Sequence, residues 1–97
     1  MENKARTEEL KNFIREHEAL FWYSPGDKGE TVSDELLVET IINYGNMNNV
    51  KQLFRLMGIR KTAQIFFDSI NQSERRKNNY YELARDYFTH YFNRYAN

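Results

Sequence analysis

The chain has 97 residues and a hydrophobic fraction of 40%, which is enough for one domain with a modest core and argues against disorder. It contains no cysteine, so disulfide bonds, thiol catalysis and cysteine zinc sites are excluded. No apolar run reaches the length of a transmembrane helix and the start of the chain lacks the apolar segment of a signal peptide, so we expect a cytoplasmic protein.

Charges of the two signs balance in total, at 14 each, but they are unevenly distributed. Residues 1–49 contain five Lys and Arg against ten Asp and Glu, whereas residues 50–97 contain nine against four. This asymmetry has two interpretations. Either the second half presents a basic face to nucleic acid or to an acidic partner, or the two halves attract each other within the chain or in a head-to-tail dimer.

Apolar residues recur at helical spacing from Thr7 onwards. Thr7 is placed as the N-cap of a first helix, followed by two glutamates that favourably meet the helix dipole. One apolar stripe follows, with His17 on its edge. The only proline then predicts a turn at residues 24–27, in an exposed loop whose rim carries Trp22.

A second helix is predicted over residues 33–44, with Ser33 as its N-cap and Gly45 at its end. Val32 and Leu37 are spaced to form a hydrophobic staple at its start. Apolar residues cover most of the circumference of this helix, which predicts the buried centre of the fold.

Two further amphipathic helices are predicted on either side of Gly58. Residues 71–79 then form a polar, basic stretch that predicts a loop. Asn79 and Glu82 have the spacing of a capping box for a last helix over residues 80–94.

The sequence therefore predicts an all-α fold, a compact bundle of about five short helices. We expect a single domain over residues 1–97, with residues 1–6 as a frayed N-terminal tail. Neither strand-like alternation nor an internal repeat argues for another architecture.

Few patterns indicate catalysis, because the chain lacks a glycine-rich phosphate loop and a metal-binding pair of histidines on one helix. Arg85, followed five residues later by His90, resembles the Arg–His signature of the HEPN ribonucleases, small helical proteins in which these residues meet at a dimer interface to cleave RNA. Histidine can transfer protons near neutral pH, and arginine can stabilise a phosphorane. Arg85 and His90 are therefore candidate catalytic residues, although five positions on a helix turn through about 140°.

The two helices around Gly58 also have the outline of a helix-turn-helix, in which early residues of the second helix contact base edges. The basic stretch beyond that helix would bind the phosphate backbone. Phe54 argues against this hypothesis, since the position four before the glycine normally holds a small residue. The candidate DNA contacts are Arg60, Lys61, Gln64, Arg75, Arg76 and Lys77.

Seven aromatic rings lie within residues 80–95, more than one side of one helix can bury in a domain of this size. An inward stripe is expected to include Tyr91 and Tyr95, while Tyr81 and Tyr87 stay exposed. Exposed tyrosines are typical of protein interfaces and also suit stacking on single-stranded RNA. The candidate protein contacts are Trp22, Tyr81, Tyr87, Tyr91 and Tyr95.

Three stretches, LFWYSPGDKGETVSDELLVETIINYG, NMNNVKQLFRLMG and YFTHYF, together resemble a family of small uncharacterised bacterial helical proteins. The resemblance covers residues 20–92 and departs at Tyr23, where an acid is expected, and at Asn46, where Asp is usual. Members are often encoded beside abortive-infection toxin–antitoxin cassettes, so the resemblance implies an antitoxin-like or accessory role in bacterial defence and brings no catalytic residues. The matching positions are Leu20, Phe21, Trp22, Tyr44, Gly45, Leu53, Gly58, Tyr91 and Phe92.

From these patterns we expect a non-enzymatic protein-interaction module without cofactor or metal. Its partner would be a toxin-like protein or a second copy of the chain. The alternatives are a helix-turn-helix DNA-binding antitoxin or repressor and a HEPN-like ribonuclease.

Overall fold

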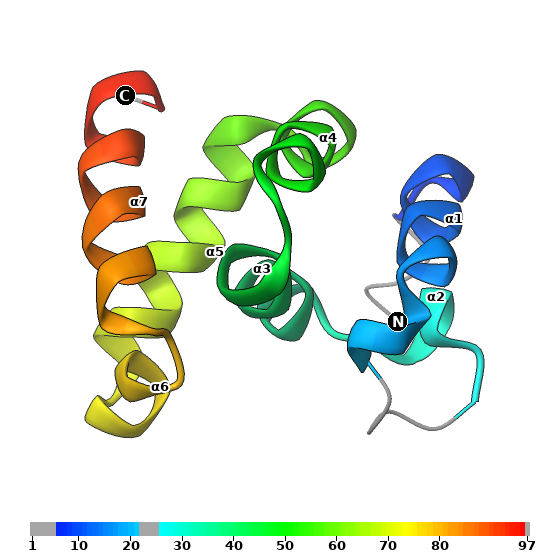
Figure 1. Cartoon of the computed structure of the whole chain (residues 1–97), viewed down its shortest axis with the longest axis horizontal. Helices are drawn as coiled ribbons and strands as arrows, with labels where there is room; N and C mark the ends of the chain where they lie inside the picture. Colours follow the sequence, from blue (N-terminus) through cyan, green and yellow to red (C-terminus); the bar gives the residue numbers. More distant parts are fainter. Residues whose placement is uncertain (1–5, 22–25, 97) are drawn as a thin grey trace.

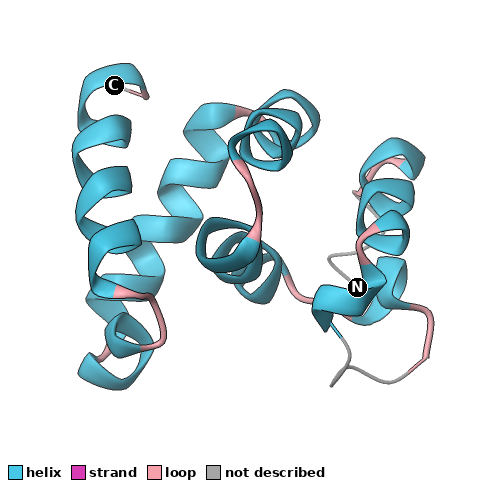
Figure 2. Ribbon diagram, viewed as in Figure 1, coloured by secondary structure: helices cyan, strands magenta, loops and turns pink. Residues whose placement is uncertain are grey.

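The computed structural model describes residues 6–21 and 26–96, and these residues form helices joined by short loops (Figures 1 and 2). The predicted all-α fold class is confirmed, since the described residues contain no strand. Five helices have at least nine residues and correspond to the five predicted ones: α1 (Glu8–Glu16), α3 (Asp34–Tyr44), α4 (Met47–Met57), α5 (Ile59–Gln72) and α7 (Glu82–Tyr95).

Three shorter helices were not predicted: the 3-10 helix η2 (Glu18–Phe21), α2 (Lys28–Thr31) and α6 (Glu74–Asn78). Two of them lie in segments that the sequence pattern assigned to loops. Asp27 caps α2 by accepting a hydrogen bond from the N–H of Gly29, and Ser73 caps α6 in the same way. Helices of four or five residues are too short to show an apolar period, so only their caps could have indicated them.

The ends of the longer helices test the predicted caps. Thr7 and Ser33 cap α1 and α3 as predicted. The predicted capping box of Asn79 and Glu82 is wrong, because Asn79 ends α6 and α7 begins at Glu82 without any side-chain cap. Gly58 ends α4 with φ of +97°, a conformation that a residue with a β-carbon rarely adopts.

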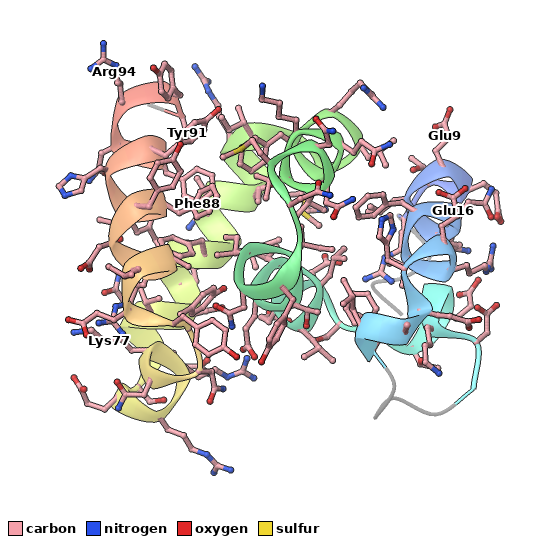
Figure 3. All side chains as sticks on the ribbon, viewed as in Figure 1. Glu9, Glu16, Lys77, Phe88, Tyr91 and Arg94 are labelled. Carbon is pink, nitrogen blue, oxygen red and sulfur yellow. The ribbon has the colours of Figure 1, made fainter. Side chains whose placement is uncertain are left out.

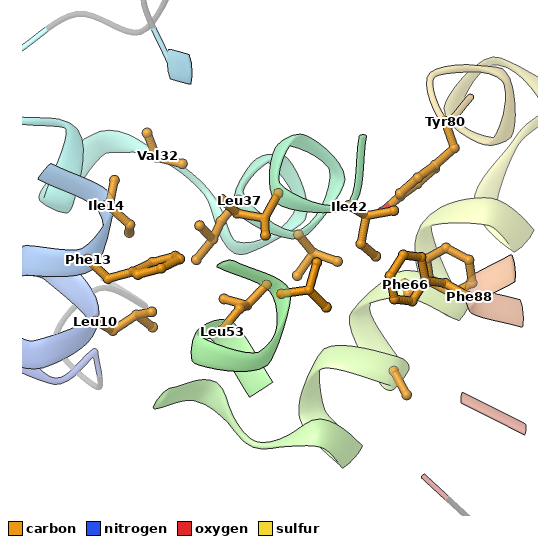
Figure 4. Close-up of a cluster of buried hydrophobic side chains, with 14 of the residues drawn as sticks. Leu10, Phe13, Ile14, Val32, Leu37, Ile42, Leu53, Phe66, Tyr80 and Phe88 are labelled. Carbon is orange, nitrogen blue, oxygen red and sulfur yellow. The ribbon is translucent and has the colours of Figure 1, made fainter. Parts of the chain in front are cut away.

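The helices lie side by side in the order α7, α5, α3 with α4, and finally α1 with α2 (Figure 1). The core runs through the five long helices, from Phe13 of α1 through Leu37 and Leu53 to Phe66 of α5 and Phe88 of α7 (Figure 4). The central position predicted for the second helix is confirmed, since α3 buries five of its eleven residues.

Arg6 anchors the start of the described chain, although the sequence placed it in a frayed tail. It is buried, and its guanidinium donates to the carbonyl oxygens of Gly29 (2.9 Å) and Val32 (2.8 Å) and to Asp34 (2.6 Å). These partners offset the cost of removing the charge from water. The other residues of the predicted tail, 1–5, lie outside the described part.

His17 joins α1 to the start of α4. The ring donates from Nδ1 to the carbonyl oxygen of Phe13 (2.8 Å), because a carbonyl can only accept. The amide of Asn49 uses its oxygen in a reciprocal capping box with Asn46, so its nitrogen faces Nε2 of His17 at 3.0 Å. Asn49 therefore caps α4 and donates to α1 with one amide group.

Asn43 of α3 performs a similar task for the turn between α6 and α7. Its amide nitrogen donates to the carbonyl oxygen of Asn79 (2.9 Å), and its oxygen accepts from the N–H of Tyr81 (3.0 Å). The start of α7 is thus held by a side chain that is far away in sequence.

Candidate protein interface on the last helix

Exposed apolar side chains are concentrated in one region of the described chain. They lie on α7, on the residue that precedes it, or at the corner between α3 and α4: Tyr44, Met47, Tyr81, Leu83, Tyr87 and Tyr95. Leu83 is the extreme case, with 84% of its surface exposed.

The inward side of α7 is fixed by aromatic packing. Phe88 and Phe92 are buried, and the ring of Phe92 lies 5.2 Å from that of Phe66 and 5.5 Å from that of Phe54. Figure 3 shows Phe88 and Tyr91 on the side of α7 that faces the rest of the molecule. Residues on the other side of α7, such as Leu83, therefore face solvent.

The predicted interface tyrosines have different surroundings. Tyr81 and Tyr87 are exposed, as expected, and Tyr91 is half-buried against Phe54. The expectation that Tyr95 belongs to the inward stripe is wrong, since 56% of its surface is exposed. Its ring stacks on Tyr91 at 4.7 Å, because Phe88 and Phe92 already occupy the inward side. Trp22 lies outside the described residues.

Three of these tyrosines form one surface hollow. It has a volume of about 250 Å³ and is lined by Tyr87, His90, Tyr91, Arg94 and Tyr95. The guanidinium of Arg94 lies 5.6 Å above the ring of Tyr95, within the range of a cation–π contact. Tyr81 lies elsewhere, where its hydroxyl donates to that of Tyr44 at 2.8 Å.

The candidate DNA contacts border three different hollows of the described surface. Arg60 and Gln64 line a groove between α5 and α7, whereas Lys61 lines a pocket next to Arg6. The remaining candidates form α6, where Arg75 and Arg76 line a third groove against α3. The amide of Gln64 donates to the carboxylate of Asp68 at 3.1 Å, which places a negative charge beside the proposed base contact.

Arg85 and His90 also have separate surroundings. The half-buried Arg85 donates to the carbonyl oxygen of Lys77 at 3.2 Å, toward α6. His90 is exposed and belongs to the hollow near the other end of α7. Within one chain, these two candidate catalytic groups face different environments.

The charge asymmetry is not resolved by ion pairs between the two halves. Every ion pair within the described part joins residues between Arg6 and Asp34. Between the halves, Glu39 faces Arg76, whose charge opposes the increase in the pKa of Glu39 that burial causes. Most cations of the second half are therefore available to solvent or to a partner.

Other kinds of site receive no support from the described residues. In residues 6–21 and 26–96, no three His, Asp or Glu side chains converge where they could hold a metal ion. Across the same ranges, each helix is too short or too polar to cross a lipid bilayer. Comparison of the chain with protein-family models, with curated proteins and with solved structures finds no match.

Proposed function

We propose that this protein is a non-enzymatic protein-interaction module whose contact surface is the outer side of α7. The observation that carries the proposal is the concentration of exposed apolar side chains on and beside this helix, with Leu83 almost fully exposed. Apolar groups gathered in this way on a small domain are typical of binding surfaces. Tyrosine adds to this, since its large ring loses little conformational entropy when it is bound.

The charges around α7 support the same choice. Arg94 and His90 border the hollow, and the nearby cations have no carboxylate partner within the described part. Arginine and tyrosine are both enriched in the residues that dominate binding energy at protein interfaces. The resemblance to proteins encoded beside toxin–antitoxin cassettes extends the proposal to an antitoxin-like or accessory role in bacterial defence, with a toxin-like protein or a second copy as partner.

Affinity capture from the source cells, after nuclease treatment, tests this function. The tagged protein is compared with a Tyr87→Ser/Tyr95→Ser variant and with a Glu9→Ser control, which changes an exposed side chain of α1 at the opposite end of the molecule from α7 (Figure 3). We expect a stoichiometric partner that is kept by the control and lost with the double variant. Equal capture by all three proteins would contradict the role of α7.

DNA binding is the second candidate, because Arg60, Lys61 and Gln64 are all exposed on the first two turns of α5. Under this hypothesis, Arg60→Glu/Lys61→Glu abolishes an electrophoretic mobility shift that the unaltered protein produces. An unchanged shift would exclude α5 as a recognition helix.

A HEPN-like ribonuclease has less support, because Arg85 and His90 face different surroundings. An unaltered rate of RNA cleavage in His90→Ala would exclude this function.

A further inference from the structure

The sequence of α7 contains a four-residue repeat in which a charged or titratable residue precedes a large apolar one. The repeats are Glu82-Leu83, Asp86-Tyr87, His90-Tyr91 and Arg94-Tyr95. Residues four apart on a helix lie only about 40° apart, so each set forms a continuous row along the surface. The helix thus carries a charged row beside an apolar row. The apolar row begins at Leu83, the most exposed of its residues, and turns around the helix axis until it ends at Tyr95.

The charged row changes sign at its middle. The acids Glu82 and Asp86 occupy the first half, and the cation Arg94 occupies the second half together with the imidazole of His90. If two such helices lie antiparallel about a twofold axis, Glu82 faces the partner's Arg94 and Asp86 faces the partner's His90. A parallel arrangement would instead place like charges opposite each other, which is unfavourable.

The apolar row fits the same arrangement. An axis that brings Leu83 opposite the partner's Tyr95 also brings Tyr87 opposite the partner's Tyr91. The apolar pairs require the twofold axis to pass at the level of Thr89, whereas the charged pairs require it at the level of Phe88. The two requirements differ by one residue, about 1.5 Å along the helix. That difference is within the reach of side chains, so one dimer satisfies both rows. Rows of this spacing pack against each other in the commonest class of helix crossing.

Shape agrees with charge. Leu83 projects from the helix with 84% of its surface exposed. The hollow of about 250 Å³ lies toward the opposite end of α7 and is bordered by Tyr91 and Tyr95, the region that the partner's Leu83 would reach. The arrangement is reciprocal, since each copy supplies one projecting leucine and one hollow.

We propose that α7 pairs antiparallel with α7 of a second copy, with Leu83 of each protomer seated in the hollow of the other. The inference deepens the proposed function and rests on it for the choice of α7 as the contact surface. Acids at the start of a helix and bases at its end also stabilise the helix dipole. That effect accounts for the order of the charges, but it does not require the apolar row or the hollow. A contact along one helix of 14 residues is small, so the dimer is weak and reversible.

Charge reversal separates pairing from the dipole effect. Sedimentation equilibrium, up to millimolar concentration, compares the unaltered protein with Glu82→Lys, Arg94→Glu and the double variant. Each single change turns two symmetry-related attractions into repulsions, and we expect the dimer Kd to rise between roughly ten-fold and a hundred-fold. Glu74→Lys is the matched control, because it makes the same change of charge at an exposed position of α6 and leaves Kd unchanged.

The decisive result is rescue. The double variant, and an equimolar mixture of the two single variants, place opposite charges at both ends of the antiparallel pair, so dimerisation returns in both. A dipole effect predicts the reverse, since the double variant combines two unfavourable changes. A loss of dimer without rescue would therefore overturn the antiparallel pairing.

Leu83→Asp provides an independent test of the contact between Leu83 and the hollow of the second copy. Leu83 is exposed in the single chain, so we expect an unchanged circular dichroism spectrum together with loss of the dimer. An unaltered protein that stays monomeric at millimolar concentration, or a dimer whose Kd is unchanged by Leu83→Asp, would overturn the inference.

The outcomes also separate self-pairing from the proposed function. If the unaltered protein is monomeric yet captures a foreign protein that Leu83→Asp and Tyr87→Ser/Tyr95→Ser release, self-pairing fails and the proposed function stands. Absence of both capture and dimer would remove both.

Discussion

The two ends of the molecule are stabilised in different ways. The first region, α1 to α2, uses ion pairs and hydrogen bonds at its surface, such as Lys11 with Glu30 (2.8 Å) and Arg15 with Asp27 (3.0 Å). The last region, α5 to α7, is joined by aromatic rings around Phe66 and Phe92, and no ion pair under 4.0 Å is found among its described residues. Exposed apolar side chains on helices are found in the last region and at its border with α3 and α4, and not on α1 or α2.

This difference indicates where each region directs its interactions. Both cations of α1, Lys11 and Arg15, are paired with carboxylates of the same region, and the hydrogen bond from Arg15 is the main reason why the pKa of Asp27 is lowered. In the last region the rings stabilise the fold on one side of α7 and remain exposed on the other, next to cations that form no ion pair with the carboxylates of residues 6–21 and 26–96. Binding capacity is therefore expected at the last region, and the following substitutions test that contrast.

The largest expected effect comes from the aromatic layer. Phe92→Ala removes a fully buried ring that contacts Phe54, Phe66 and Phe88, so we expect the free energy of unfolding to fall by about 3–5 kcal/mol. Chemical denaturation followed by circular dichroism measures this loss. Tyr95→Ala, in the same helix but exposed, serves as control and should change stability by less than about 1 kcal/mol. Equal losses would mean that the two sides of α7 do not differ.

A smaller loss of stability, confined to the first region, is expected when the hydrogen bonds of Arg6 are removed. Arg6→Met keeps much of the side-chain volume but removes the hydrogen bonds to Gly29, Val32 and Asp34, which leads us to expect a loss of about 1–3 kcal/mol. Hydrogen exchange should accelerate in α1 and α2 and stay unchanged in α7. Uniform acceleration across all helices would instead show that the two regions unfold as one unit.

The amide shared between α1 and α4 ranks next. Asn49→Ala removes half of a capping box and the bond to His17, and helix caps of this kind contribute about 0.5–2 kcal/mol. Asn48→Ala, one residue earlier and exposed, is the matched control. Thermal unfolding of both variants measures the difference, and a variant as stable as its control would show that the amide of Asn49 is dispensable.

The smallest effect concerns the carboxyl at the border of the regions. Burial raises the pKa of Glu39 above its ordinary value, while Arg76 and Asn79 oppose that change. When the pKa of a carboxyl is higher in the folded than in the unfolded state, ionisation lowers the free energy of unfolding as the pH rises from the unfolded pKa through the folded pKa. Below the unfolded pKa the carboxyl is protonated in both states, and its ionisation then has no effect on stability. Glu39→Gln should therefore be slightly more stable than the unaltered protein at neutral pH, and equal to it in acid. A neutral-pH stability below that of the unaltered protein would show that the pair with Arg76 dominates.

The sequence was a sufficient guide to the long helices because each has an apolar period and most have a recognisable start. It was insufficient for Asn79, whose spacing to Glu82 fits a capping box, because the competing helix α6 depends on Ser73 and has no apolar stripe. The burial of Arg6 could not be predicted either, since its acceptors are backbone carbonyls 23 and 26 residues away.

The candidate surface shows the same division. Exposure of Tyr81 and Tyr87 follows from crowding of rings on one helix, which is a property of the sequence. The position of Tyr95 depends on which rings of α7 pack inward. Phe92 packs inward because Phe54 and Phe66 of other helices contact it, and this could not be read from the sequence of α7. The four-residue repeat of α7 is visible in the sequence, but its meaning depends on the exposure of Leu83, which only the packing of the helix reveals.

The attachment of Asn43 to the turn before α7 has a consequence for the order of folding. Because α7 has no side-chain cap of its own, the position of its start depends on that amide, and we expect α7 to reach its final position after α3 has formed. A fragment with α5 to α7 alone would hold its last helix loosely. We therefore expect the helix proposed to recognise a partner to reach its final position late, and a chain in which α3 is unfolded would not present a finished α7 for association.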